Sequence, residues 1–135
     1  MPRDNSEIVR RFADGLAQGD RDATAELIHP DAEWHTMAGP ILGVEAVRGR
    51  NEVISFLFDR IPEGFEDYTA TVDGIRELPD DRLLVLGHYA GRGRSSGAVM
   101  EMTSAAIYRF EAGMIVSFHD FASEAEALRT ARASN

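Results

Sequence analysis

The chain has 135 residues, of which 44% are hydrophobic and 27% charged, values typical of a folded globular protein rather than a disordered, collagen-like or coiled-coil one. This length provides one hydrophobic core and is too short for two, so we expect a single domain over residues 1–135. Acidic residues outnumber basic ones by 23 to 14, and a formal net charge of -9 speaks against nucleic acid as a partner.

Two segments of the first half show apolar residues at helical spacing. The capping box Asp4-x-x-Glu7 precedes the first segment and predicts a helix over residues 4–18. The second segment follows Gly49 and predicts a helix over residues 50–61. Each helix would present one apolar face, so both need a larger apolar surface against which to pack.

Between these helices we expect a short helix, a strand and a loop. Asp20 or Asp22 can cap a helix over residues 21–29. This helix should stop before Pro30, because a residue that precedes proline is disfavoured in the helical conformation. Residues 32–37 alternate in polarity and predict an edge or entry strand, and the glycines that follow predict a loop.

From Phe65 onward the apolar period changes from helical to alternating, which predicts a run of strands. Turn sequences separate them, so they should pair as antiparallel neighbours. A second capping box, Ser123-x-x-Glu126, predicts a final helix. Helices followed by antiparallel strands are typical of an α+β fold whose helices cover one face of a curved sheet. The expected strands span residues 68–78, 82–92, 98–110 and 114–121.

Alternation along the strands assigns each residue to one face of the sheet, provided that the turn at Ser95 pairs Gly91 with Met100. The face that would meet the helices then carries Val85, Gly87, Tyr89, Met102, Ser104, Ala106, Val116, Phe118 and Asp120. The opposite face is also largely apolar and carries His35, His88 and His119, which we interpret as interface or surface histidines. Three helices can cover only one face, so we expect the other to form a homodimer.

The absence of several residue types and motifs limits the possible chemistry. The chain has no cysteine, which excludes disulfides, thiolate metal sites and cysteine nucleophiles. Its four histidines are scattered rather than spaced as ligands, so we expect neither a metal nor another cofactor. The sequence has no phosphate-binding glycine loop and no HExxH motif. It also has no GxSxG nucleophile elbow, because the string GRSSG at residues 93–97 falls at a turn between two expected strands. No apolar stretch reaches the roughly 18 residues of a membrane span, so we expect a cytoplasmic protein without a membrane partner.

Three segments, in this order, resemble the nuclear transport factor 2-like superfamily, and within it the SnoaL-like polyketide cyclase and limonene epoxide hydrolase branches. They are HPDAEWH at residues 29–35, GRNEV at residues 49–53 and GMIVSFHDF at residues 113–121. The resemblance spans nearly the whole chain and implies a cone, in which a curved antiparallel sheet wraps around three N-terminal helices and leaves a pocket at its open end. Isomerases, dehydratases, cyclases, hydrolases and binding modules share this fold, so the fold alone does not decide the function.

The resemblance also suggests a role for individual residues. The last segment is similar to the epoxide hydrolase strand that ends in Trp-Arg-Asp-Tyr, whose aspartate helps to activate water, and Asp120 falls on that aspartate. Trp34 and Thr36 fall where those enzymes hold the water with Tyr and Asn. Their Arg-x-Asp pair would fall near Gly87 and Tyr89, which argues against the same mechanism here. The base of the ketosteroid isomerases has no counterpart after the first strand, which argues against a steroid isomerase.

We therefore predict a pocket with one acidic group, Asp120, acting as general acid or base. Apolar surroundings disfavour the charged form of a carboxylate and so suit it to proton transfer. Ser123 already supplies the cap of the final helix, so Asp120 is not needed there. The residues expected to shape the pocket are Trp34, Thr36, Tyr89, Met102, Ser104 and Phe118.

Two functions from different classes fit this pattern. The first is a cofactor-free cyclase, isomerase, dehydratase or hydrolase that acts on an apolar, oxygenated small molecule. The second is a non-catalytic small-molecule-binding or dimerisation module of the same fold. Arg92 and Arg94 flank a hairpin tip, where we expect both to be solvated.

Overall fold

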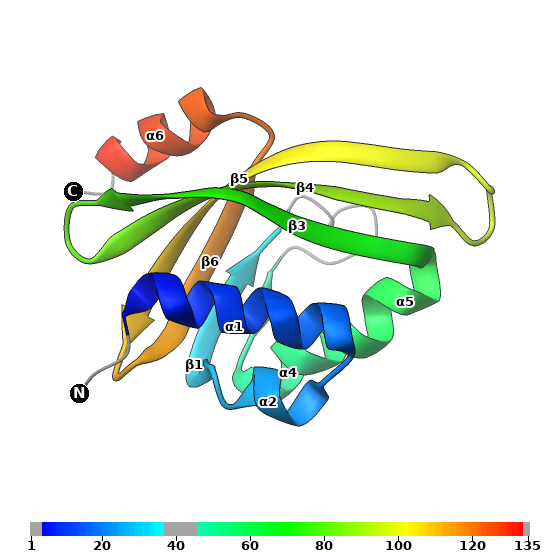
Figure 1. The fold of residues 1–135 in the computed structure, drawn as a ribbon, viewed down its shortest axis with the longest axis horizontal. Helices are drawn as coiled ribbons and strands as arrows, with labels where there is room; N and C mark the ends of the chain where they lie inside the picture. The colour runs from blue at the N-terminus through cyan, green and yellow to red at the C-terminus, as the bar shows by residue number, and fades with distance from the viewer. Residues whose placement is uncertain (1–3, 37–45, 134–135) are drawn as a thin grey trace.

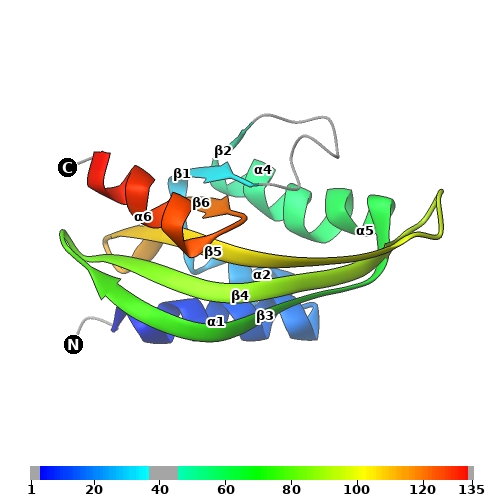
Figure 2. The ribbon, with the colours of Figure 1, turned by 90° about the horizontal axis from the view of Figure 1, so that it is seen from above.

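A computed structural model of the protein describes residues 4–36 and 46–133. Its helical elements are α1 (Asn5–Gln18), α2 (Arg21–Ala25), α4 (Arg50–Ser55), the π-helical turn η1 (Phe56–Arg60), α5 (Ile61–Gly64) and α6 (Glu124–Ala133). Its strands are β1 (Ile28–His35), β2 (Val47–Arg48), β3 (Phe65–Leu78), β4 (Arg82–Gly93), β5 (Val99–Glu111) and β6 (Met114–Phe121). They form one curved sheet in the order β2-β1-β6-β5-β4-β3, with α6 on one face and the other helices on the opposite face (Figures 1 and 2). The α+β prediction is confirmed.

The first helix begins and ends where the sequence predicts. The Asp4 carboxylate accepts a hydrogen bond from the backbone N–H of Ser6 at 2.7 Å, which satisfies one of the open donors of the first turn. Gly19 ends the helix with a φ of 68°, a conformation that glycine adopts without steric cost. The buried face, which includes Ile8, Val9 and Phe12, packs into the main core of the protein.

The predicted helix over residues 21–29 is wrong beyond Ala25. Strand β1 begins at Ile28, and the carbonyl oxygen of Leu27 accepts a hydrogen bond from the N–H of Ile115 at 2.8 Å. A residue before proline prefers extended backbone, and for His29 this preference was interpreted as the end of a helix. Extended backbone is equally the conformation of a strand. Proline lacks an N–H, and the β1–β6 register shifts between Ile28 and Glu33, where Pro30 lies. The tertiary pairing with β6 therefore decides the conformation of this segment.

The strand predicted over residues 32–37 begins earlier, at Ile28, and is not an edge strand, because β1 lies between β2 and β6. Strand β1 pairs in parallel with β6, while the other strand pairs between described residues are antiparallel. Its other edge pairs with β2, a strand that was not predicted, through Trp34 and Val47. Met37 and the glycine-containing loop expected after it lie outside the described residues.

Alternation holds through β4 and most of β5, but register shifts interrupt it in β3 and β6. The shift in β6 places Ile115 in the main core with Phe118, so the prediction that Val116 lies on that face is wrong. Strand β6 has the predicted bounds, and β3, β4 and β5 differ from the prediction by one to three residues at an end.

Gly91 lies opposite Met100, the pairing on which the assignment of faces depends. Ala106 lies opposite Asp120 in the next strand pair. Asp120 therefore belongs to the face that meets α1 and α4, as predicted.

The predicted helix over residues 50–61 continues to Gly64 and contains the π-helical turn η1. A π turn inserts one additional residue into the helical repeat and so rotates the side chains that follow it. Three consecutive apolar residues, Phe56, Leu57 and Phe58, border the cavity described below. The regular periodicity of an α-helix could not have predicted that arrangement.

The second face of the sheet has a cover that the sequence argument did not include. Helix α6, whose first turn is capped by Ser123, buries Ala127 and Ala131 against that face. The sheet residues in this cluster are Leu84, Ala105, Ile107 and Phe121. Among the described residues, the large apolar side chain classed as exposed is Val99, at 69%. The homodimer stays a prediction. It was based on an uncovered apolar face of the sheet, and α6 covers part of that face.

Candidate functional site

The sheet, α1 and the segment from η1 to α5 enclose a cavity of about 440 Å³. This volume is within the range of small-molecule sites, which are typically apolar with a few polar groups. Aromatic side chains from seven elements form much of the wall, among them Phe12, Trp34, Phe56, Phe65, Tyr89, Tyr108 and Phe118. The cavity therefore provides an apolar environment with flat ring surfaces for a ligand.

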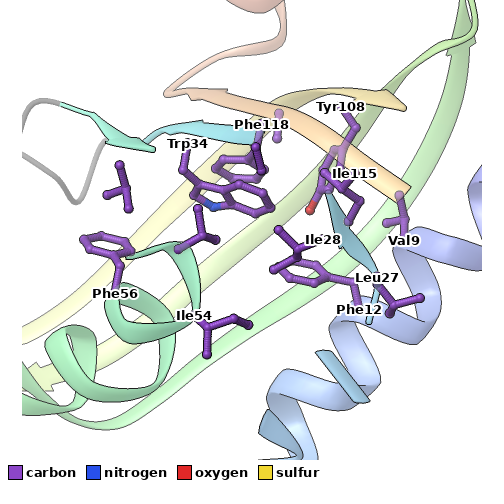
Figure 3. Close-up of a cluster of buried hydrophobic side chains, with 14 of the residues drawn as sticks. Val9, Phe12, Leu27, Ile28, Trp34, Ile54, Phe56, Tyr108, Ile115 and Phe118 are labelled. Carbon is purple, nitrogen blue, oxygen red and sulfur yellow. The ribbon is translucent and has the colours of Figure 1, made fainter. Parts of the chain in front are cut away.

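Trp34 and Phe118 form one wall of this cavity. They lie opposite each other on β1 and β6, and their rings stack with centroids 4.8 Å apart. Phe12 contacts Trp34 from α1, and Tyr108 meets the edge of Phe118 from β5 (Figure 3). Trp34 is only 2% exposed and is the sole tryptophan of the chain. The packing holds this wall rigidly, and the fluorescence of Trp34 can report on a bound ligand.

A tyrosine and a carboxylate form the polar centre of the site. Tyr89 borders the cavity, and its hydroxyl donates a hydrogen bond to Oδ2 of Asp120 at 2.8 Å. Ser104 Oγ lies 3.5 Å from the Tyr89 hydroxyl and donates to it. Asp120 is 4% exposed and is not among the described residues that border the cavity. A ligand in the cavity therefore meets Tyr89, and Asp120 lies behind it.

All three tyrosines of the chain, Tyr68, Tyr89 and Tyr108, border the cavity. Burial, and secondly the charge of Asp120, raise the pKa of each phenol above its usual range. The three hydroxyls are therefore neutral near pH 7 and can act as hydrogen-bond donors or acceptors.

Two of these tyrosines were not among the predicted site residues. Tyr108 could have been found, because it follows Ala106 by two residues on the same face of β5. Tyr68 could not, because the β3–β4 register shifts between Glu66 and Thr69. Such a shift breaks the alternation from which a face is inferred.

Of the six residues predicted to shape the pocket, the structure places five on its wall. They are Trp34, Thr36, Tyr89, Ser104 and Phe118. Met102 is half-buried and is not among the described wall residues. One residue that was interpreted as solvated, Arg94, borders the cavity, so that interpretation was incomplete.

The histidines lie mainly on the opposite face, as expected. The rings of His35 and His119 are paired across β1 and β6 with centroids 5.1 Å apart. Burial, followed by the neighbouring His35, lowers the pKa of His119. His88 borders the cavity, but its exposed imidazole lies 2.9 Å from the Asp73 carboxylate.

We expect all three tyrosines to stay protonated above pH 10 for as long as the protein is folded. Their pKa values are raised in the fold, whereas unfolded tyrosines ionise at about pH 10. The unfolded chain thus releases protons that the folded chain retains, so this contribution to stability is present below pH 10 and is lost as the pH rises. An ultraviolet titration of tyrosinate should show ionisation only together with unfolding. The same titration in concentrated urea is the control, and an ordinary midpoint in the folded protein would contradict the structure.

Within residues 4–36 and 46–133, no group of three or more histidine, aspartate or glutamate side chains is arranged to hold a metal ion. No helix in the same residues has the length and apolar character needed to cross a membrane.

Comparisons with solved structures return the same fold. An NTF2-like protein from Burkholderia thailandensis is 28% identical, with a TM-score of 0.79 and 98% of each chain covered. An NTF2-like protein of unknown function from Burkholderia pseudomallei is 25% identical, with a TM-score of 0.76, covering 94% of this chain and 96% of the other. TerC, co-crystallised with polyporic acid, is 18% identical, with a TM-score of 0.75, covering 94% of this chain and 97% of its own.

No curated protein matches the chain. The sequence does match the family described as the SnoaL-like domain, over residues 9–118. That match covers every element from the second turn of α1 to the middle of β6. The chain therefore belongs to the SnoaL-like domain family of the nuclear transport factor 2-like superfamily.

Proposed function

We propose that this protein is a cofactor-free enzyme that transfers a proton to or from an apolar, oxygenated small molecule bound in the cavity. The observation that carries the proposal is the hydrogen bond of 2.8 Å between Tyr89, on the cavity wall, and the buried carboxylate of Asp120. Membership of the SnoaL-like family, whose members include cyclases and isomerases, agrees with this class of chemistry.

In this proposal Tyr89 touches the substrate and Asp120 exchanges a proton with Tyr89. When the substrate loses a proton, the Tyr89 oxygen accepts it while the hydroxyl proton moves to Asp120. The reverse sequence delivers a proton to a substrate oxygen. Because burial and the Asp120 charge raise the pKa of Tyr89, a free tyrosinate is disfavoured and the two transfers occur together. A positioned proton transfer of this kind contributes typically ~10²–10⁴-fold to the rate.

The composition of the wall supports the proposed substrate class. An apolar ring system would stack on the pair formed by Trp34 and Phe118. Tyr68 and Ser104 border the same cavity, and their hydroxyls could bind a substrate oxygen. TerC, which shares the fold, was co-crystallised with polyporic acid.

A second function is favoured by one specific observation. Asp120 is not among the described residues that border the cavity, so a ligand would meet hydroxyl groups rather than the carboxylate. A binding module would use the Tyr89–Asp120 pair to orient a ligand without changing it. Turnover distinguishes this function from the first, since both require binding.

The test uses 5-nitrobenzisoxazole, an apolar probe that opens when a base removes its ring C–H proton and its N–O bond breaks to give a coloured phenolate. The quenching of Trp34 fluorescence measures binding, and phenolate absorbance measures turnover. We expect the wild-type protein to exceed the rate of the same concentration of acetate. Ala70→Phe, which fills the cavity from β3, should abolish binding and turnover.

Thr69→Phe is the matched control, because Thr69 is the exposed neighbour of Ala70 and is not among the described wall residues. It should behave as the wild type does. Binding without acceleration would overturn the enzyme and support the binding module. No binding of the probe would overturn both functions.

A further inference from the structure

We propose that Arg94 forms an anion-binding subsite at the cavity, so that the preferred ligands are elongated apolar acids that carry a carboxylate. This inference rests on the proposed function, because it assumes that the cavity is where a ligand binds. It goes further by naming a charged group for that ligand and the side chain that recognises it.

The structure holds Arg94 in place through two hydrogen bonds to backbone carbonyl groups of α5. Its backbone N–H donates to the carbonyl oxygen of Gly64 at 3.1 Å. Its side-chain Nε donates to the carbonyl oxygen of Pro62 at 2.5 Å. Pro62 and Arg94 both border the cavity. These bonds fix the β4–β5 hairpin against α5 and restrict where the guanidinium can lie.

The guanidinium has more hydrogen-bonding capacity than its described neighbours use. It carries five N–H donors, and Pro62 accepts from one of them. The carboxylate of Glu66 lies 3.7 Å from NH1, which is an ion pair but too long for a hydrogen bond. The side chain is 51% exposed, so water can leave and a ligand can enter. Two parallel N–H groups of a guanidinium match the two oxygens of a carboxylate.

The charged residues of the cavity wall favour Arg94 as the site that binds an anion. All 14 basic residues of the chain are arginines, and Arg94 is the arginine among the described residues that border the cavity. Asp67 is the acidic residue in the same set, and it is exposed to solvent, which screens its repulsion of an anion. Because the protein as a whole is acidic, an anion is favoured only where a cation is placed locally.

The spacing along β4 indicates the shape of the ligand. Tyr89 and Gly93 are four residues apart on β4, which at about 3.4 Å per residue separates their Cα atoms by roughly 14 Å, and Arg94 follows Gly93 in the turn. A ligand that reaches the Tyr89 hydroxyl while its carboxylate contacts Arg94 must therefore be elongated. Phe65, which lies opposite Gly93, and Tyr68, whose ring stacks on that of Tyr89, border the cavity along this stretch and would contact its apolar body.

Calorimetric titration with two ligands of the same shape tests the subsite. The probes are biphenyl-4-carboxylate, which carries the charge, and biphenyl-4-carboxamide, which does not. Arg94→Gln removes the charge and keeps a donor for Pro62. We expect this variant to bind the carboxylate about tenfold more weakly and the carboxamide within about twofold of the wild type.

Arg92→Gln is the matched control. Arg92 is 52% exposed and has an Nε 4.0 Å from Glu66, but it is not among the described residues that border the cavity. It should leave both affinities unchanged. Unchanged carboxylate binding in Arg94→Gln would overturn the subsite while carboxamide binding still supports the cavity as a ligand site. Failure of both probes to bind the wild type would overturn the ligand site itself, and with it this inference.

Discussion

Asp120→Asn is expected to lower turnover of a proton-transfer substrate by about 100-fold to 10,000-fold while leaving its binding within about threefold. Asparagine has the shape of aspartate, and its amide oxygen can still accept the hydrogen bond from Tyr89, so the fold should be retained. An amide cannot take up the proton that the proposed relay delivers. Measuring kcat and KM on 5-nitrobenzisoxazole, with Trp34 fluorescence for binding, separates the two effects.

Two further variants make this result specific. Tyr89→Phe should cause a loss similar to that of Asp120→Asn, and the double variant should lose little more, because residues that act as one unit are not additive. Glu101→Gln is the matched control, since Glu101 is an exposed carboxylate on the opposite face of the same sheet. If Asp120→Asn keeps the wild-type kcat, the carboxylate takes no part in the chemistry.

Gly87→Ala is expected to destabilise the protein by about 2 to 3 kcal/mol. A Cβ atom at this position would lie 2.2 Å from the carbonyl oxygen of Thr71, which belongs to the backbone of the neighbouring strand. The β3–β4 register shifts between Val72 and Gly74, and this shift brings the two strands into close approach. Urea unfolding should give a lower midpoint, with the free energy of unfolding reduced accordingly.

Gly74→Ala provides the matched control for this substitution. Gly74 lies in the same strand pair, but a Cβ atom there would meet nothing within 4 Å. We expect the free energy of unfolding of this variant to lie within about 1 kcal/mol of the wild-type value, because only the difference in backbone entropy between glycine and alanine remains. Equal unfolding midpoints for the two variants would show that the close approach at Gly87 has no energetic consequence.

The crowding at Gly87 also explains a departure from the epoxide hydrolase branch. The resemblance would place the arginine of that branch near Gly87, on the face that borders the cavity. There is no room here even for a methyl group without moving the backbone of β3. The water-activating set of that branch therefore cannot be assembled at this position, and the polar centre of this cavity is built from Tyr89 and Asp120.

Local chemistry in the sequence was sufficient to predict most of the elements and the face on which Asp120 lies. Capping residues such as Asp4 and Ser123 act within one helical turn, so their effect does not depend on the rest of the fold. Alternation in β4, β5 and β6 is likewise a property of the extended backbone. Once Gly91 is paired with Met100, the strand geometry brings Tyr89, Ser104 and Asp120 to one face.

Only the tertiary structure decided the features that depend on contacts between distant segments. The segment from Ile28 became a strand because β6 offered a partner for its backbone. Tyr68 joined the cavity because a register shift, invisible in the sequence, turned it inward. Arg94 came to the cavity wall because carbonyl oxygens of α5 hold the hairpin beside it. In each case the deciding interaction joins residues far apart in the chain. The energy of such an interaction cannot be predicted from local periodicity.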